Sequence, residues 1–362
     1  MSVGLGIVGL GRWAHAHADA VGRTDSIHLT SCFSRDADRR AAFASEYGLS
    51  HTADSYEMML ADPEVEAVVL ATPNDLHVSM ALAAIEAGKP VLIDKPVSVD
   101  LPSGLQLLRV VTASDAQVGI AQHPRRLAGL RTAKRWLESG DAGAPRLADA
   151  NFSNSRGAHL KPDAWHRNVE GSDAGVLIQV GIHQVDNVLW LLGPPVAVNA
   201  RLGHQTLGRL ADSAVVIIQH SSGAVSTVTS SWTTPGLFRL ELQATGGNLR
   251  YRLDHRYWTS GDVDDHGSIV LDQDDQSGRS LDMVKGDPLS EQLAELAAAT
   301  RRPGAMEVDV AAGLRAVSVV LAAVRSSERG GSEVGLGDML VEAGATADEV
   351  TLLTAGAADR AT

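Results

Sequence analysis

A glycine-rich turn between an apolar run and a helical segment places the strongest constraint on how this chain can fold. Gly9, Gly11 and Ala14 form a G-x-G-x-x-A pattern directly after the strand-like run 3–8. The first glycine permits a tight turn, the second lets the backbone approach a pyrophosphate, and the small third residue lets the helix pack closely on the strand. Phosphates can then bind the free N–H groups at the helix start.

This context favours a dinucleotide site over a glycine-rich turn that binds nothing. The residues of the turn expected to contact the cofactor are Gly9, Leu10, Gly11, Arg12 and Trp13.

The first third of the chain alternates short β-rich runs with helical segments. Strands separated by helices indicate βαβ units with a parallel sheet. Runs that are apolar on both faces fit a sheet covered by helices on each side. We therefore expect an α/β dinucleotide-binding domain over residues 1–121. After the first strand and helix, the expected strands and helices are, in chain order, 27–33, 36–47, 67–71, 76–87 and 90–93.

After residue 121 the pattern changes to paired β-rich runs. One pair flanks the turn 221–224, and a second flanks Gly246-Gly247, a two-residue glycine turn typical of a β-hairpin. Helical segments lie at 130–139 and close the chain at 290–300 and 309–326. Residues 122–362 are therefore expected to form an α+β domain, although no pattern explains the tail after Gly335.

Bulk properties narrow the partners that the chain could have. The 362 residues fit two domains, and the net charge of −13 argues against binding nucleic acid. A single cysteine, Cys32, excludes an intrachain disulfide. We find no signal peptide and no apolar stretch close to the ~20 residues that span a bilayer. The expectation is a cytoplasmic protein without membrane partners.

No sequence pattern predicts a metal site. No histidine or cysteine cluster has the spacing of metal ligands. The aspartate-rich stretch 262–275 lacks the glycine and the glutamate of a calcium loop, and we interpret it as a solvated turn.

The choice between NAD and NADP depends on the residues after the second strand. An acidic residue there would bind the ribose hydroxyls of NAD, but this chain has Ser34 and Arg35. Serine removes the repulsion of a 2′-phosphate, and the guanidinium of Arg35 can pair with it. NADP(H) is therefore favoured over NAD(H). A shift of one residue would place Asp36 at the acidic position and reverse this preference, and Arg35 could simply be a solvated loop residue.

Further motifs resemble a known enzyme family. The segment 71–77 reads Ala-Thr-Pro-Asn-Asp-Leu-His, and Asp94-Lys95-Pro96 follows the next strand. In the second half, Gly181, His183 and Asp186 form a G-x-H-x-x-D pattern. Together with the glycine-rich turn, these motifs occur in the same order as in the glucose–fructose oxidoreductase/inositol dehydrogenase (Gfo/Idh/MocA) family, which this chain resembles from residue 1 to about 330.

The resemblance implies a Rossmann domain followed by a domain with a large, open, mostly antiparallel sheet. It also implies a homo-oligomer, a dimer or tetramer, formed through that sheet. Taken alone, Pro73 would only start a helix and His77 would be a residue on the helix surface. The further cofactor contacts that the resemblance implies are Thr72, Pro73, Asn74, His77, Asp94, Lys95, Trp165 and Arg167.

Lys95 and His183 are the expected catalytic pair. Hydride transfer to or from a secondary alcohol needs a donor that stabilises the developing alkoxide and a group that manages the hydroxyl proton. Lys95 follows a strand at the carboxyl edge of the sheet, where ligands of open α/β folds bind. His183 can exchange the alcohol proton near neutral pH. We expect Lys95, Gln122, Gln179 and His183 to contact the substrate.

One departure from the family pattern concerns the support of His183. Many members carry a carboxylate four residues before the histidine, where this chain has Gln179. Glutamine can orient an imidazole but cannot stabilise an imidazolium by charge. Asp186 could supply that charge, or it could be only a structural residue of the helix. In the segment 122–126, Arg125 and Arg126 could recognise an acidic substrate or form interdomain ion pairs.

The main hypothesis is reversible oxidation of a secondary alcohol of a sugar, polyol or related ring, with a nicotinamide cofactor. A second hypothesis keeps the fold but gives no net redox change, as in hydrolysis, elimination or decarboxylation. A third hypothesis is a nucleotide-binding regulator without catalysis. The presence of Lys95 and His183 argues against it.

Overall fold

The computed structural model describes residues 2–161, 164, 172–273, 276–302, 304 and 306–355. Trp165 and Arg167, two expected cofactor contacts, lie outside the described residues.

The chain forms two compact units. Unit 1 contains Met1–Val99, Ser103–His123 and Asp287–Gly313, and unit 2 contains Asp100–Pro102, Pro124–Gly286 and Leu314–Thr362. The expected boundary after residue 121 lies close to the passage from His123 to Pro124. The division differs from the expectation in one respect, since a late segment, Asp287–Gly313, returns to unit 1.

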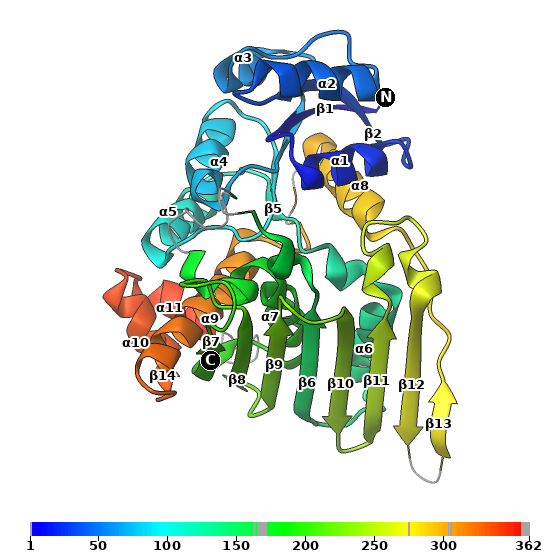
Figure 1. Ribbon diagram of the computed structural model, residues 1–362, viewed down its shortest axis with the longest axis vertical. Coiled ribbons are helices and arrows are strands. Elements are labelled where there is room, and N and C mark those ends of the chain that lie inside the picture. Colours follow the sequence, from blue (N-terminus) through cyan, green and yellow to red (C-terminus); the bar gives the residue numbers. More distant parts are fainter. Residues whose placement is uncertain are drawn as a thin grey trace. The chain divides into compact units, whose positions relative to one another are not determined.

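Unit 1 is built on a five-stranded parallel sheet with the order β2-β1-β3-β4-β5 (Figure 1). The predicted parallel α/β domain is confirmed. The order also creates a switch point between β1 and β3, from which the chain proceeds to opposite sides of the sheet. The strands are β1 (Val3–Val8), β2 (Ile27–Phe33), β3 (Ala67–Leu70), β4 (Val91–Ile93) and β5 (Val118–Ile120).

The helices of the first 123 residues connect these strands. Of the elements in this region, α3 and β5 were not predicted because they are short, and α5 was not predicted although Leu101, Leu105 and Leu108 recur at helical spacing. The helices are α1 (Arg12–Val21), α2 (Ala37–Tyr47), α3 (Tyr56–Ala61), the 3-10 turn η1 (Asn74–Leu76), α4 (His77–Glu86) and α5 (Leu101–Thr112).

A helix from late in the chain completes the core of unit 1. Helix α8 (Pro288–Arg301) packs against α1, and its Leu289, Leu293 and Leu296 belong to the same buried cluster as Leu5 of β1. Arg301 at its end forms an ion pair with Glu66, with Nη1 2.6 Å from Oε1. These contacts explain why residues 287–313 belong to the first unit.

Unit 2 contains a nine-stranded sheet with the order β13-β12-β11-β10-β6-β9-β8-β7-β14. All neighbouring strands run antiparallel except β6 and β9, so the predicted large, mostly antiparallel sheet is confirmed. The strands are β6 (Pro145–Ser153), β7 (Pro195–Gly203), β8 (Ser213–His220), β9 (Val225–Ser231), β10 (Leu237–Ala244), β11 (Gly247–Leu253), β12 (Gly267–Gln273), β13 (Gln276–Ser280) and β14 (Val334–Gly335).

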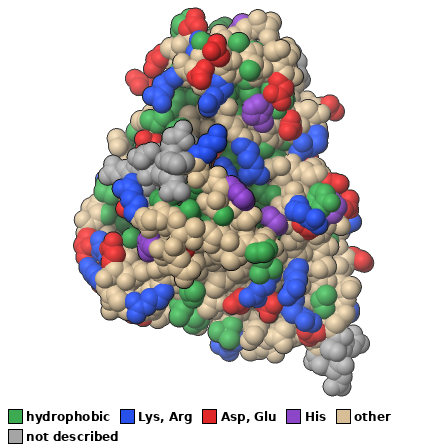
Figure 2. All heavy atoms as spheres, in the orientation of Figure 1, with side chains coloured by type: hydrophobic (Ala, Val, Ile, Leu, Met, Phe, Trp, Pro, Cys, Tyr) green, Lys and Arg blue, Asp and Glu red, His purple; other side chains and the backbone are tan. Residues whose placement is uncertain are grey.

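One face of this sheet is covered and the other is open. Helices α6 (Ala128–Glu138) and α7 (Ile182–Leu192) pack on the covered face, against β11 and β6 respectively (Figure 1). Along β8 buried residues alternate with exposed ones, as a half-buried strand requires. Over the strands of the open face, Figure 2 shows hydrophobic side chains interspersed with Lys, Arg, Asp and Glu.

The end of the chain is helical. Helix α9 (Val310–Glu328) is 19 residues long and apolar enough to cross a membrane by length and composition alone, which the sequence analysis did not recognise, but 72% of its apolar window is buried. A core helix of a globular protein has the same properties. The unpredicted tail adds β14 to the sheet edge beside β7 and continues into α10 (Leu336–Glu342) and α11 (Ala347–Thr354).

Gly129, the second residue of α6, lets this helix approach the sheet. A Cβ atom built on Gly129 would lie 2.1 Å from Cε2 of Tyr251, a β11 residue that is fully buried. Gly337 occupies the matching position in α10, and a Cβ atom there would meet only Val350, at 3.8 Å.

Gly129→Ala is therefore expected to lower the stability of unit 2 by about 1–3 kcal/mol, because the Tyr251 ring or the helix must move. Gly337→Ala should leave it unchanged or raise it by up to about 1 kcal/mol, the ordinary gain of alanine in a helix. Urea unfolding followed by far-UV circular dichroism measures both. Equal effects of the two substitutions would contradict the packing argument.

Candidate active site

The glycine-rich turn lies at the switch point of the parallel sheet. Gly9 follows β1 and has a φ of 84°, in the left-handed region that glycine adopts readily. A Cβ atom on Gly9 would lie 2.5 Å from the carbonyl oxygen of Ala71, which follows β3. Both the backbone conformation and the close approach of these two strand ends therefore require glycine at this position.

The start of α1 suits a pyrophosphate. Gly11 precedes the helix, and a Cβ atom there would meet nothing within 4 Å, so the backbone borders open space. Free N–H groups in the first turn of α1 can donate to phosphate oxygens in that space. The guanidinium of Arg12 lies 5.6 Å from the ring centre of Trp13. The turn residues predicted from the sequence therefore fit the phosphates of a dinucleotide.

The residues after β2 form a small hydrogen-bonded loop. Asp36 caps α2, since its Oδ1 accepts from the backbone N–H of Arg39 at 3.0 Å. Ser34 is half-buried, and its carbonyl oxygen accepts from Arg40 at 2.7 Å. The exposed Arg35 makes no hydrogen bond or ion pair with the part of the chain that the structure describes.

The loop after β4 holds Lys95 in a buried position. The backbone N–H of Asp94 donates to Leu70 at 2.8 Å, which joins this loop to the end of β3. The Asp94 carboxylate in turn accepts from the backbone N–H of Lys95 at 2.8 Å. Asp94 is 8% exposed and Lys95 is 6% exposed. Lys95 is therefore a buried lysine at the carboxyl edge of the sheet, as the sequence predicted.

His77 lies between the loops after β3 and β4. Its Nδ1 is 2.7 Å from the carbonyl oxygen of Pro96, and its Nε2 is 3.0 Å from that of Thr72. The side chain is fully buried, so it is not on the helix surface, whereas Thr72 and Pro73 are half-buried. Burial lowers the pKa of His77, against the opposing effects of the Pro96 carbonyl, Asp94 and the Thr72 carbonyl.

Asn74 and Gln122 also belong to this edge of unit 1. Asn74 begins η1 and is 7% exposed, whereas Gln122 follows β5 and is 1% exposed. The neighbouring His123 packs on Trp13 of the glycine-rich turn, with ring centres 5.5 Å apart. The structure therefore brings together predicted residues from the ends of four strands, β1, β3, β4 and β5.

His183 is set in an aromatic pocket of unit 2. It is the second residue of α7, is 2% exposed, and its ring centre lies 5.6 Å from that of Trp258 and 6.1 Å from that of Phe152. No sequence motif identified Trp258 or Phe152, because strand and loop aromatics carry no recognisable spacing. Edge-on aromatic contacts fix the plane of the imidazole.

A π-helical turn precedes His183. The segment Leu177–Gly181 is a π-helix and contains the half-buried Gln179. Such turns are rare and are frequently found at functional sites. A Cβ atom on Gly181 would lie 2.7 Å from Oγ of Ser230, so glycine allows the start of α7 to lie directly on β9. The sequence predicted the helix after Gly181 but not the π-turn.

Asp186 and Arg125 form a buried ion pair. Nε and Nη2 of Arg125 donate to the two carboxylate oxygens of Asp186 at 2.7 and 2.6 Å. Asp186 therefore has a charged partner in Arg125. The pair lies within unit 2 and gives Arg125 a structural contact.

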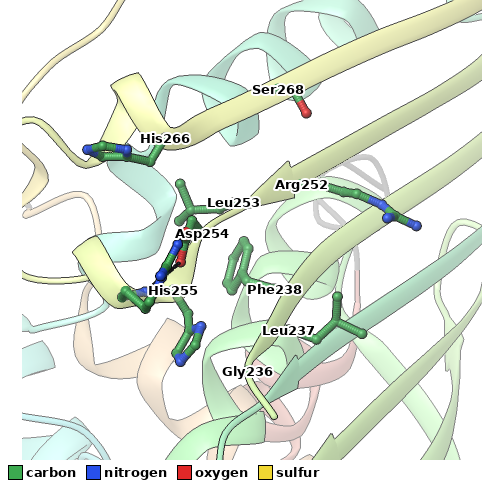
Figure 3. Close-up of a pocket in the computed structure, with 10 residues that line it drawn as sticks. Gly236, Leu237, Phe238, Arg252, Leu253, Asp254, His255, His266 and Ser268 are labelled. Atoms are coloured by element: carbon green, nitrogen blue, oxygen red, sulfur yellow. Dashed lines mark hydrogen bonds and ion pairs between the residues drawn. The ribbon is translucent and has the colours of Figure 1, made fainter.

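Unit 2 also has a hollow at one end of the sheet. A cavity of about 410 Å³ is lined by the start of β10, the end of β11 and nearby turns, including Phe238, Arg252 and His255. Figure 3 shows Arg252 and His255 pointing in different directions, and Asp254 is paired with Arg256. None of the residues predicted for the site lines this hollow.

Comparisons with known proteins agree with this geometry. Residues 3–122 match the oxidoreductase family with an NAD-binding Rossmann fold, and residues 130–250 match the GFO/IDH/MocA C-terminal domain. An oxidoreductase from Desulfitobacterium hafniense, described as NADPH-dependent, superposes with a TM-score of 0.89 at 29% identity, covering 94% of this chain and 99% of that one.

Two curated relatives are similar over much of their length. The 1,5-anhydro-D-fructose reductase of Ensifer adhaerens is 26% identical over 67% of this chain and 74% of that protein. Inositol 2-dehydrogenase 3 of Saccharopolyspora erythraea is 26% identical over 62% of this chain and 65% of that protein.

The two family matches together span more than half of the 362 residues and correspond to the two units of the structure. The resemblance found in the sequence motifs is thereby confirmed, and the chain belongs to the Gfo/Idh/MocA family of NAD-binding oxidoreductases.

Proposed function

We propose that this enzyme transfers a hydride between NADP(H) and a secondary alcohol or ketone of a sugar, polyol or related hydroxylated ring. The observation that carries the proposal is the buried Lys95 at the same sheet edge as the glycine-rich turn. The names of the relatives, a sugar reductase and an inositol dehydrogenase, support the substrate class. When bound, the nicotinamide supplies the hydride or accepts it.

Lys95 is proposed to bind the substrate oxygen and to stabilise the charge that develops on it. An ammonium group in a buried site interacts more strongly with such a charge than it would in water. The Asp94 carboxylate fixes the backbone N–H of Lys95, which limits the positions that the side chain can reach.

His183 is proposed to accept or return the hydroxyl proton, and Gln122 and Gln179 to bind substrate hydroxyls. Gln179 replaces the carboxylate that many family members carry at this position, and it can orient the imidazole without supplying charge. The Phe152 and Trp258 rings pack beside the imidazole and contribute to its orientation.

The preference for NADP(H) rests on the loop after β2. The Asp36 carboxylate is engaged as a helix cap, which supports Ser34 as the residue at the ribose position. The exposed Arg35 can pair with a 2′-phosphate without breaking a contact to the described residues. The same site would bind the pyrophosphate through Gly9–Trp13 and the nicotinamide ribose through Thr72, Pro73, Asn74 and Asp94, with Trp165 and Arg167 as further expected contacts.

A homo-oligomer formed through the open face of the nine-stranded sheet is also proposed. Leu147 of β6 and Val215 and Ile217 of β8 are 48%, 51% and 41% exposed on that face. Large exposed apolar side chains on one face of a sheet support its use as an interface. The free, buried Cys32 is compatible with the cytoplasm, which we propose as the location.

Lys95→Met is expected to lower kcat by roughly 10²-fold or more, because general acid–base catalysis contributes about that much. Cofactor affinity should change far less. Steady-state kinetics with NADP⁺ and a polyol panel measure the effect, and His183→Gln should show a loss of similar kind. His51→Gln, at an exposed position outside the site, is the control. Full activity of Lys95→Met would refute the assignment.

Arg35→Ala is expected to weaken NADPH binding about tenfold or more and to leave NADH binding unchanged, since a charged hydrogen bond is worth about 1.5–3 kcal/mol. Fluorescence titration with each cofactor measures this. Arg39→Ala is the matched control, because its guanidinium lies 3.8 Å from Asp36. An equal loss for both cofactors, or no loss for either, would contradict the NADP preference.

Ile217→Arg is expected to shift the protein from an oligomer towards the 38.0 kDa monomer, because it buries a charge in the proposed interface. Sedimentation velocity measures the distribution. Val341→Arg, on α10 and 60% exposed, is the control. A monomeric parent protein, or an unchanged Ile217→Arg oligomer, would contradict an interface on this face.

A further inference from the structure

The backbone of Lys95 is fixed on both sides by buried side chains. On the N-terminal side, the Asp94 carboxylate accepts from the Lys95 N–H at 2.8 Å. On the C-terminal side, the carbonyl oxygen of the next residue, Pro96, lies 2.7 Å from Nδ1 of His77. Because His77 is fully buried, water does not compete for this contact.

The same imidazole also contacts the loop after β3. Its Nε2 is 3.0 Å from the carbonyl oxygen of Thr72, at the end of β3. His77 is the first residue of helix α4, so the ring is held by a third element besides the two loops that it contacts. One ring therefore lies between the loop that carries Lys95 and the loop that carries Thr72, Pro73 and Asn74.

The protonation of the ring determines which contact is a hydrogen bond. Carbonyl oxygens only accept, and a neutral imidazole carries a single N–H. Burial lowers the pKa of His77 below its ordinary value and so favours the neutral ring, although the Pro96 carbonyl, Asp94 and the Thr72 carbonyl act in the opposite direction. The contact to Pro96, at 2.7 Å against 3.0 Å to Thr72, is the shorter and favours a proton on Nδ1 that is donated to the Pro96 carbonyl.

We propose that His77 is a positioning residue that places Lys95 for catalysis by holding the Pro96 carbonyl. The inference rests on the proposed function of Lys95. This role of His77 is exerted through the two loops that it holds and adds to the cofactor contact expected from the sequence. A displacement of the reacting group by about 1 Å can cost roughly 10²-fold in rate, so a small movement of this loop is enough.

Two substitutions separate the contacts of the ring. In His77→Asn, the side-chain amide can occupy the place of Nδ1 and still donate to Pro96. In His77→Gln, the amide reaches the place of Nε2, towards Thr72, and the Pro96 contact is lost. Both variants remove a ring of the same size, so their stability losses should be similar.

His77→Gln is expected to lower kcat by roughly tenfold to a hundredfold with KM for the polyol changed much less, because a misplaced ammonium loses more of its interaction with the charge that develops in the transition state than of its contact with the neutral substrate oxygen. His77→Asn should recover most of that loss. Steady-state kinetics and thermal unfolding of both variants are measured together. Equal kcat losses that follow the stability losses would show a purely structural role and overturn the proposal, as would an unchanged kcat in His77→Gln.

The tautomer of His77 in the unmodified protein gives a second test that does not require either variant to fold. In a ¹⁵N NMR spectrum of protein labelled at histidine, we expect the proton of the His77 ring on Nδ1. The signal is assigned to His77 through its contact with Pro96. A proton on Nε2 alone, directed at Thr72, would overturn the proposal. Failure of the proposed function would appear separately, as full activity of Lys95→Met or as a parent protein without dehydrogenase turnover.

Discussion

The close approach of β1 and β3 at their carboxyl ends is the constraint on which the site depends. Gly9 must lack a side chain because a Cβ atom on it would lie only 2.5 Å from the carbonyl oxygen of Ala71. This contact leaves the start of α1, the proposed phosphate site, and the Thr72 loop side by side. The next loop joins the same edge through the hydrogen bond from Asp94 to Leu70. One sheet edge thus combines the proposed phosphate site with a buried lysine.

Much of this could be predicted from the sequence, because the signals are local. A G-x-G-x-x-A turn between a strand and a helix specifies a backbone path, and Asp94-Lys95-Pro96 after an apolar run specifies a place at the sheet edge. Hairpins were found from their glycine turns. Short elements with little apolar period, such as α3 and β5, were missed, as was the edge strand β14.

Contacts between residues distant in sequence could not be predicted. The sequence left open whether Asp186 supports His183 or only the helix, and it did not indicate that the carboxylate binds Arg125, which lies 61 positions away. His77 resembled either a surface residue or a cofactor contact, whereas the structure buries it between two carbonyls. Helix α8 returns to the first unit through apolar packing that has no motif. Such partners are set by tertiary packing, which the local pattern does not encode.

The central claim is that the protein carries out net hydride transfer. The most direct test is to mix the purified enzyme with NADP⁺ and a panel of sugars and cyclic polyols and to follow the absorbance of the reduced nicotinamide. The account predicts that absorbance rises in proportion to the alcohol oxidised for at least one member of the panel. Consumption of a substrate without a net change in that absorbance would contradict it and would indicate a reaction with no net redox change.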